Sequence, residues 1–210
     1  MRRLKLAQKF ALIAVVLLIP FGFVTTSYLS VQNHNLDFST KERYGVTAIR
    51  PMVELLGLVG DARGRAARGE GSAASDIQAS VARVDAQLAE LQTKLAVADG
   101  WTALKAKIAS ATEAATPAEA FDAWTGVSLD ATALITDTAD VSNLTLDPDL
   151  DSYYLMDAFT VKIPTMTDAI GLAGDLAVVD ARAHAGDIAI AGATLDAAHA
   201  AVVRDVQKAI

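Results

Sequence analysis

The residue types and spacing that could support chemistry are concentrated in one aspartate-rich stretch. Its carboxylates Asp147, Asp149 and Asp151 alternate along the chain, as the first three ligands of a calcium-binding loop do. The sixth position of such a loop requires glycine and the twelfth requires a bidentate glutamate, but the sequence has Ser152 and Ala158 there. The stretch therefore does not predict a calcium site.

A helix start explains the same residues. Asp147 would cap the helix, Pro148 would occupy its first position, and Asp149 and Asp151 would face the positive end of the helix dipole. Three carboxylates at a helix start repel anions, so a cationic ligand is electrostatically easier to hold there. The side chains that would then pack inward or line a cavity are those of Tyr153, Tyr154 and Met156.

The other reactive side chains form no catalytic pattern. The histidines, His34, His184 and His199, are too few and too scattered for a metal site, and His199 is expected to lie buried or half-buried on an apolar helix stripe. The chain has no cysteine, which excludes thiolate ligands and a cysteine nucleophile. Zinc-protease, nucleophile-elbow, phosphate-loop and dinucleotide fingerprints are absent from the sequence. We therefore predict neither an enzyme nor a bound metal or cofactor.

A small basic cluster, Arg63, Arg65 and Arg68, is the remaining candidate. It falls within residues 61–75, a stretch rich in glycine, arginine and alanine that is expected to form the turn between two antiparallel helices. Arginines are mostly exposed in folded proteins. We therefore predict a solvated corner in preference to an anion-binding site.

The overall charge excludes a further class of function. The chain has 210 residues, with 18 lysines and arginines against 25 aspartates and glutamates, and a net charge of −7. A nucleic-acid-binding protein needs a basic footprint, so no nucleic-acid partner is expected. Four basic residues precede the first acidic residue, Asp37: Arg2, Arg3, Lys5 and Lys9. The rest of the chain has the other 14 basic residues and all 25 acidic residues. Such asymmetry indicates a membrane protein.

An apolar segment follows the basic start. No charged residue occurs between Lys9 and Asp37, and residues 10–31 provide the roughly 20 positions that a membrane-spanning helix needs. A cleaved signal peptide begins in the same way, but a clear Ala-x-Ala cleavage site is missing, so an uncleaved anchor is favoured. By the positive-inside rule, residues 1–9 form a cytoplasmic stub and residues 10–31 cross the inner membrane of a bacterium. Residues 32–210 would then lie in the periplasm or outside the cell.

The elements that must position these residues are predicted to be helices. A first helix is expected over about residues 32–68. A heptad pattern over residues 77–95 predicts a second, which Ser75 can cap and which the pair Asp99-Gly100 should end. The sequence Thr116-Pro-Ala-Glu119 has the form of a capping box and predicts a helix that continues to about Leu146.

Two further helices complete the predicted fold. One runs from about Pro148 to about Arg182 with a bend at Pro164, and the other runs from Asp187 or Thr194 to the C-terminus. No stretch alternates as a strand does. The fold class is therefore all-α, a membrane helix followed by an antiparallel helical bundle.

The stretch Ser142–Asp157 closely resembles a motif in the extracytoplasmic sensor region of bacterial methyl-accepting chemotaxis proteins. Shorter pieces fit the same order: the basic and apolar start, residues 41–45 with residues 50–56, and residues 63–69. Similar sensor regions occur on some sensor histidine kinases and diguanylate cyclases. The resembling pieces together span about residues 5–170.

The resemblance implies a periplasmic helical-bundle sensor, expected to be a homodimer; its small-molecule ligand is unknown, and sensing directly or through a binding protein both stay open. It also implies a second membrane helix, a linker and a signalling domain, but the sequence shows no second apolar span after residue 31, so the bundle is expected to be incomplete. Three functions stay open: a chemoreceptor sensor, the same sensor on a kinase or cyclase, and a non-sensing anchored scaffold. The first ligand-binding candidates are Arg50, Tyr153 and Tyr154.

Overall fold

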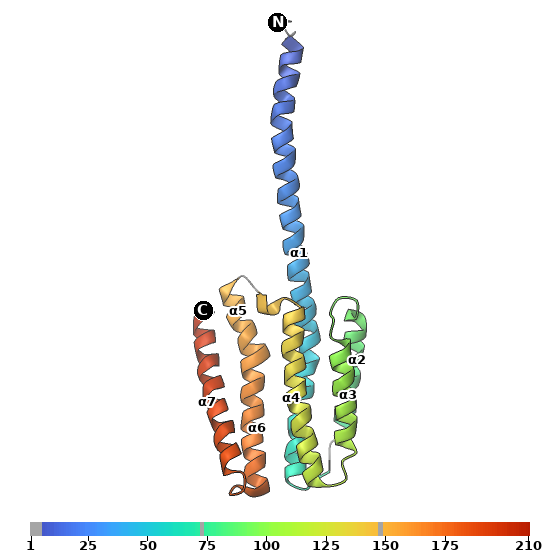
Figure 1. The fold of residues 1–210 in the computed structure, drawn as a ribbon, viewed down its shortest axis with the longest axis vertical. Helices are drawn as coiled ribbons and strands as arrows, with labels where there is room; N and C mark the ends of the chain where they lie inside the picture. Colours follow the sequence, from blue (N-terminus) through green and yellow to red (C-terminus); the bar gives the residue numbers. More distant parts are fainter. Residues whose placement is uncertain (1–5, 72–73, 147–148) are drawn as a thin grey trace. The chain divides into compact units, whose positions relative to one another are not determined.

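The structure, a computed structural model, describes residues 6–71, 74–146 and 149–210, and these residues form helices and no strand. The all-α prediction is confirmed (Figure 1). In chain order the elements are α1 (Leu6–Ala67), α2 (Ala74–Leu91), α3 (Ala98–Thr112), α4 (Pro117–Val141), η1 (Leu144–Leu146), α5 (Leu150–Asp157), η2 (Ala158–Lys162), α6 (Ile163–Asp180) and α7 (Ala185–Lys208).

The chain divides into two compact units, the first ending at Thr40 and the second comprising Lys41–Ile210. The described part of the first unit is the N-terminal part of α1. Its apolar side chains, Phe10 and Leu18 among them, are exposed, and no residue of its most apolar window is buried. This part of α1 is therefore long and apolar enough to cross a membrane by length and composition.

A second helix, α7, also meets that criterion of length and composition. No second apolar span was expected after residue 31, and by this criterion of length and composition that expectation was wrong. α7 packs along α6, and the buried positions of α7 include Ala191, Ala198 and Ala201. Small side chains at these positions let two helices approach closely, which is the arrangement of a bundle helix.

The apolar core of the second unit is built almost entirely from α1, α2, α3 and α4. The bundle part of α1 contributes side chains such as Met52 and Leu55, and the core continues through Ile77 of α2, Trp101 of α3 and Trp124 of α4. From α6 and α7, only Leu176 belongs to this fully buried cluster. Leu172 of α6 and Ile188 of α7 pack against this cluster but are only partly buried, so the α6–α7 pair lies at its margin.

Local signals set several helix ends as predicted. Thr116 and Glu119 form the predicted capping box: the Glu119 amide donates to Thr116 Oγ1 at 3.2 Å, and the Thr116 amide donates to Glu119 Oε2 at 3.1 Å. α4 ends at Val141, before the expected Leu146, because Asn143 adopts a positive φ of 67° that stops a helix.

The heptad prediction placed the end of α2 too late. α2 stops at Leu91, and Gly100 lies inside the first turn of α3 and not beyond the end of a helix. Leu95 still reaches the core from the intervening turn and is 3% exposed. The apolar spacing thus identified a buried side chain correctly, but burial at that position did not require a helix.

A polar contact joins α2 to α3. Asp85 accepts hydrogen bonds from Trp101 Nε1 and Lys105 Nζ, both at 2.7 Å. Burial alone would raise the pKa of Asp85, but the hydrogen bonds from Lys105 and Trp101 outweigh it and lower the pKa below its ordinary value. This contribution to stability is present above the ordinary pKa of 3.8 and is lost as the pH falls through the lower pKa of the folded protein.

The predicted helix between Pro148 and Arg182 is interrupted. α5 is followed by the π-helical turn η2, and α6 begins directly before Pro164. Proline lacks an amide donor and clashes with the carbonyl of the preceding turn, so a local widening of the helix there has a direct cause. The irregularity predicted at Pro164 is therefore present, but as a π-helical turn that precedes the proline.

The inward face of α7 differs from the predicted stripe. His199 was expected to lie buried or half-buried on an apolar stripe, but it is exposed, and Val206 on the same helix is 37% exposed. The buried positions are instead alanines and Asp205. Hydrophobicity alone ranked the larger side chains first, whereas close packing against α6 selects the small ones.

Candidate functional site

Arg63 of α1 is the best-buried charged side chain in the described part of the chain. It is 1% exposed, so the predicted solvated corner is wrong for this residue. α1 continues to Ala67, beyond Arg63, and the turn begins only after it. The arginine therefore lies on the helix face that packs into the bundle, whereas Arg68 remains exposed and pairs with Glu70.

The Arg63 guanidinium joins α1 to α6 through two carboxylates. Nε donates to Asp175 Oδ2 at 2.9 Å, and Nη1 donates to Asp168 Oδ1 at 2.6 Å. Nη2 also donates to the backbone carbonyl of Asp168 at 3.2 Å. Burying the charge of Arg63 is tolerable because its donors meet oxygen acceptors on two turns of the same neighbouring helix.

Ser128 connects a third helix, α4, to this cluster. Its hydroxyl donates to the same Asp168 Oδ1 at 2.6 Å. We call the four residues Arg63, Ser128, Asp168 and Asp175 the arginine network. It links α1, α4 and α6, where the α6–α7 pair meets the apolar core.

Two glycines make room for the arginine network. A Cβ atom at Gly171 would lie 2.8 Å from Arg63 Nη2, and a Cβ atom at Gly64 would lie 3.0 Å from Asp175 Oδ1. Any larger residue at Gly171 would push against the guanidinium. The sequence thus provides the space and the charges together.

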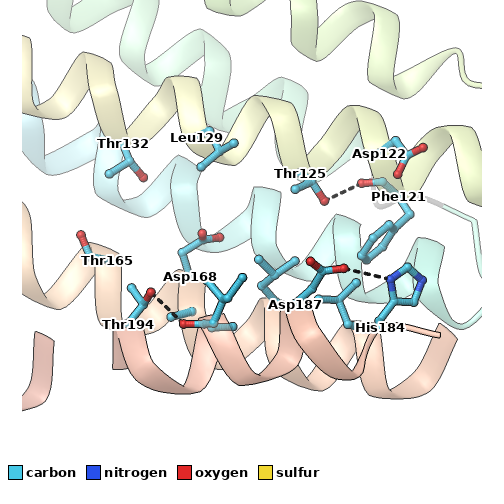
Figure 2. Close-up of a pocket in the computed structure, with 15 residues that line it drawn as sticks. Phe121, Asp122, Thr125, Leu129, Thr132, Thr165, Asp168, His184, Asp187 and Thr194 are labelled. Atoms are coloured by element: carbon cyan, nitrogen blue, oxygen red, sulfur yellow. Dashed lines mark hydrogen bonds and ion pairs between the residues drawn. The ribbon is translucent and has the colours of Figure 1, made fainter. Parts of the chain in front are cut away.

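A cavity of about 630 Å³ opens beside the network between α4, α6 and α7 (Figure 2). Its apolar lining is formed by Phe121, Leu129, Ala169, Leu172, Leu176, Ile190 and Ala191. Its polar lining is formed by Asp122, Thr125, Thr132, Thr165, Asp168, His184, Asp187 and Thr194. Although polar residues are as numerous as apolar ones, most of the lining surface is apolar. A largely apolar concave surface with convergent polar groups is the usual form of a small-molecule site.

Asp168 belongs to both the arginine network and the cavity. Its side chain is 17% exposed, and in Figure 2 it points from α6 into the cavity. The two side-chain hydrogen bonds from Arg63 and Ser128 both reach Oδ1. No hydrogen bond to Oδ2 from another residue is present within the described ranges, so this oxygen is the available acceptor.

A histidine and an aspartate lie together at one end of the cavity. His184 Nδ1 and Asp187 Oδ2 are 3.4 Å apart, at the start of α7 (Figure 2). Because Asp187 is 65% exposed, this pair contributes little to stability. It does place a further carboxylate on the cavity lining.

The ligand-binding candidates from the sequence lie elsewhere. Arg50 is exposed on α1 and lines an apolar groove together with Ser152 and Met156. Tyr153 and Tyr154 are half-buried on α5 and are not among the residues that line that groove. The structure thus brings Arg50 close to part of the predicted motif but not to the two tyrosines.

The two tyrosines contact each other and α7. Their rings meet edge to face with centroids 5.6 Å apart. The Lys208 ammonium donates to the Tyr154 hydroxyl at 3.0 Å and also lies 4.7 Å from the centre of that ring. These contacts tie α5 to the end of α7.

The aspartates of the motif serve local roles where the structure describes them. Asp151 Oδ1 accepts from the Ser152 amide at 2.9 Å, and Asp157 pairs with Lys162 at 3.3 Å. Asp149 directly precedes α5, with extended backbone angles. The predicted helix cap Asp147 and the following Pro148 lie outside the described residues.

The sequence did contain a signal for Asp168 and Asp175. They are seven residues apart, which places two carboxylates on the same face of a helix. Arg63 was noticed, but its partners lie more than a hundred residues away along the chain. Spacing alone could not join the three.

The described residues contain no group of three or more potential metal-ligating side chains. No protein family, characterised protein or solved structure matches the chain. The resemblance to chemoreceptor sensor regions therefore stays a prediction.

Proposed function

We propose that the chain is the extracytoplasmic sensing module of a membrane-anchored bacterial receptor and binds its small-molecule ligand in the cavity between α4, α6 and α7. One observation carries the proposal. Asp168 lines the cavity and is held by Arg63, which belongs to α1, the helix that also contains the apolar segment of membrane-spanning length.

The distribution of the core supports this proposal. α6 and α7 add only Leu176 to the fully buried core, and Leu172 and Ile188 pack against that core while only partly buried; the arginine network and the cavity lie at the same junction. Elements with few buried apolar contacts shift at low free-energy cost. A ligand that binds one arrangement of α6 and α7 more tightly than another would shift the population between them.

The charge distribution supports the orientation. The short N-terminal segment is basic and the remainder of the chain is acidic, which by the positive-inside rule leaves the N-terminus in the cytoplasm. The bundle then lies on the outer side of the inner membrane, where a receptor meets small molecules that the cell has not taken up.

The orientation is testable because the chain has no native cysteine. We expect a membrane-impermeant maleimide to label Thr93→Cys in intact spheroplasts, because Thr93 is exposed on the bundle. The matched variant Gln8→Cys, within the predicted cytoplasmic stub, should react only after the membrane is opened. Equal labelling of both variants in intact spheroplasts, or labelling of neither, would contradict the proposed topology.

Ligand binding is testable with the full chain in lipid nanodiscs. Trp101 and Trp124 are 4% and 0% exposed, so their fluorescence reports unfolding of the bundle. In a screen of amines, amino acids and organic acids, we expect at least one compound to raise the unfolding midpoint. At a ligand concentration one hundred times Kd, the free energy of unfolding should increase by about 2.7 kcal/mol.

The same screen has a matched pair of variants on α7. Thr194 lines the cavity and His199 does not, and both are exposed. Thr194→Phe should reduce the stabilisation by filling the cavity, whereas His199→Phe should leave it unchanged. If no compound stabilises the chain, or if Thr194→Phe binds as the unchanged protein does, this cavity is not the ligand site.

The type of receptor is a separate question that the site does not address. The coding region beyond residue 210 distinguishes the open alternatives. Long heptad-rich helices after a second apolar segment support a chemoreceptor, and a kinase or cyclase domain supports the second alternative. A homodimer is proposed for either form, in keeping with the resemblance.

A further inference from the structure

We propose that the ligand of the cavity is an organic ammonium compound with an apolar body, and that its ammonium group binds Asp168 Oδ2. This inference deepens the proposed function and rests on it. It follows from the hydrogen-bonding groups that the cavity lining leaves available.

The threonines of the cavity have already used their hydrogen-bond donors. Each threonine hydroxyl donates to the backbone carbonyl four residues earlier in the chain, at 2.7–3.0 Å. What each hydroxyl still offers to the cavity is an oxygen lone pair, which accepts hydrogen bonds. The four residues concerned are Thr125, Thr132, Thr165 and Thr194.

The charged residues of the lining are also acceptors. Asp122, Asp168 and Asp187 are acidic, and the lining includes neither lysine nor arginine. His184 is the exception, but its Nδ1 faces Asp187. Arg63 is close by, yet it is 1% exposed, does not belong to the lining, and already donates to Asp168 and Asp175. A bound molecule must therefore supply hydrogen-bond donors and preferably a positive charge.

Asp168 is the acceptor best prepared for this role. Arg63 and Ser128 hold its Oδ1, so the carboxylate is already oriented when a ligand arrives. A pre-oriented carboxylate costs less conformational entropy on binding than a mobile one. The remaining wall, including Phe121, Leu129 and Ile190, would cover the hydrocarbon part of the ligand.

The same lining selects against other head groups. A carboxylate would face acidic residues and oxygen lone pairs without a donor, apart from the His184 ring. An alcohol supplies one donor but no charge, and hydrogen bonds to charged groups are about twice as strong as neutral ones. We therefore expect the order amine, then alcohol, then carboxylate.

The test measures binding by isothermal titration calorimetry to the full chain in nanodiscs. The probes have butyl, cyclohexyl or phenethyl skeletons, each as an amine, an alcohol and a carboxylate. At least one amine should bind at least about tenfold more tightly than the alcohol of the same skeleton, because a charged hydrogen bond replaces a neutral one. Empty nanodiscs provide the background for partition into lipid.

Two matched variants locate the ammonium. Asp168→Asn and Asp175→Asn each remove one carboxylate from Arg63, but only Asp168 lines the cavity. Asp168→Asn should weaken amine binding by about tenfold to a hundredfold, and Asp175→Asn should change it much less. Thr194→Lys, on an exposed position of the lining, tests the charge without disturbing the arginine network. It should weaken amines and strengthen carboxylates.

The outcomes separate the two proposals. Carboxylates that bind better than amines, with binding blocked by Thr194→Phe, would overturn the ammonium inference and leave the sensing cavity supported. Amine binding that is equally reduced by both asparagine variants, and unaffected by Thr194→Lys, would also overturn the inference. If no probe of any class binds, the ammonium inference fails together with this cavity's role as a ligand site.

Discussion

Arg63→Ala should lower the free energy of unfolding by about 3–5 kcal/mol, the cost of breaking a buried ion pair by removing one partner. The substitution leaves Asp168 and Asp175, whose side chains are 17% and 14% exposed, without the cation that both contact. The measurement is guanidinium unfolding of the chain in detergent, followed through the buried Trp101 and Trp124. A loss below about 1 kcal/mol would contradict the stabilising role assigned to the network.

A neighbouring arginine is the matched control. Arg68 is close in sequence to Arg63, but its side chain is 46% exposed and its pair with Glu70 is solvated. Arg68→Ala should therefore leave the free energy of unfolding nearly unchanged. Both variants remove the same charge and the same side-chain length, so the difference between them isolates the effect of burial.

Removing the whole set of charges should be less harmful than removing the arginine alone. The variant Arg63→Met with Asp168→Asn and Asp175→Asn leaves no uncompensated buried charge, so it should recover much of the stability lost in Arg63→Ala. It should at the same time lose the proposed amine binding, because Asp168 no longer carries a charge. Stability and binding would thereby be separated in one molecule.

Gly45→Ala should destabilise the bundle by about 1–3 kcal/mol, although alanine is the better helix former. A Cβ atom at Gly45 would overlap the Oγ and Cβ atoms of Ser142 and would lie 2.9 Å from Leu144 Cδ1. Ser142 is 0% exposed, so it has no room to move aside. The expected result is an earlier guanidinium midpoint with an unchanged slope.

Another glycine of the same helix gives the opposite expectation. A Cβ atom at Gly57 meets no atom within 4 Å among the described residues. Gly57→Ala should therefore stabilise the chain by up to about 1 kcal/mol through helix propensity. If both alanine variants stabilise, the close approach of α1 to the residues after α4 is not as the structure has it.

Much of the fold was readable from local patterns. The capping box at Thr116 and Glu119, the heptad positions of α2 and the apolar segment of α1 each depend on residues a few positions apart. Interactions at such spacing are made within one helix, so their signal is complete in the sequence. The all-α class follows from the same local patterns.

Local patterns were less informative where packing chose between alternatives. Leu95 is buried from a turn and not from a helix, and α7 turns alanines inward and leaves His199 exposed. Hydrophobicity predicts which side chains gain from burial, but the distance between two helices determines which of them fit. That distance depends on the side chains of both helices, so the sequence of one helix does not determine which of its side chains will be buried.

The candidate site was the part of the protein that the sequence predicted least. The sequence by itself established a basic, apolar start, an acidic helical body and the absence of catalytic motifs, because composition and spacing within a helix are local properties. The tertiary structure alone shows that Arg63, expected at the surface, is buried at the centre of the arginine network. It alone shows that Asp168 belongs both to that network and to the cavity lining. The physical reason is that a buried charge is stable only beside its partners, and here those partners are contributed by helices more than a hundred residues apart.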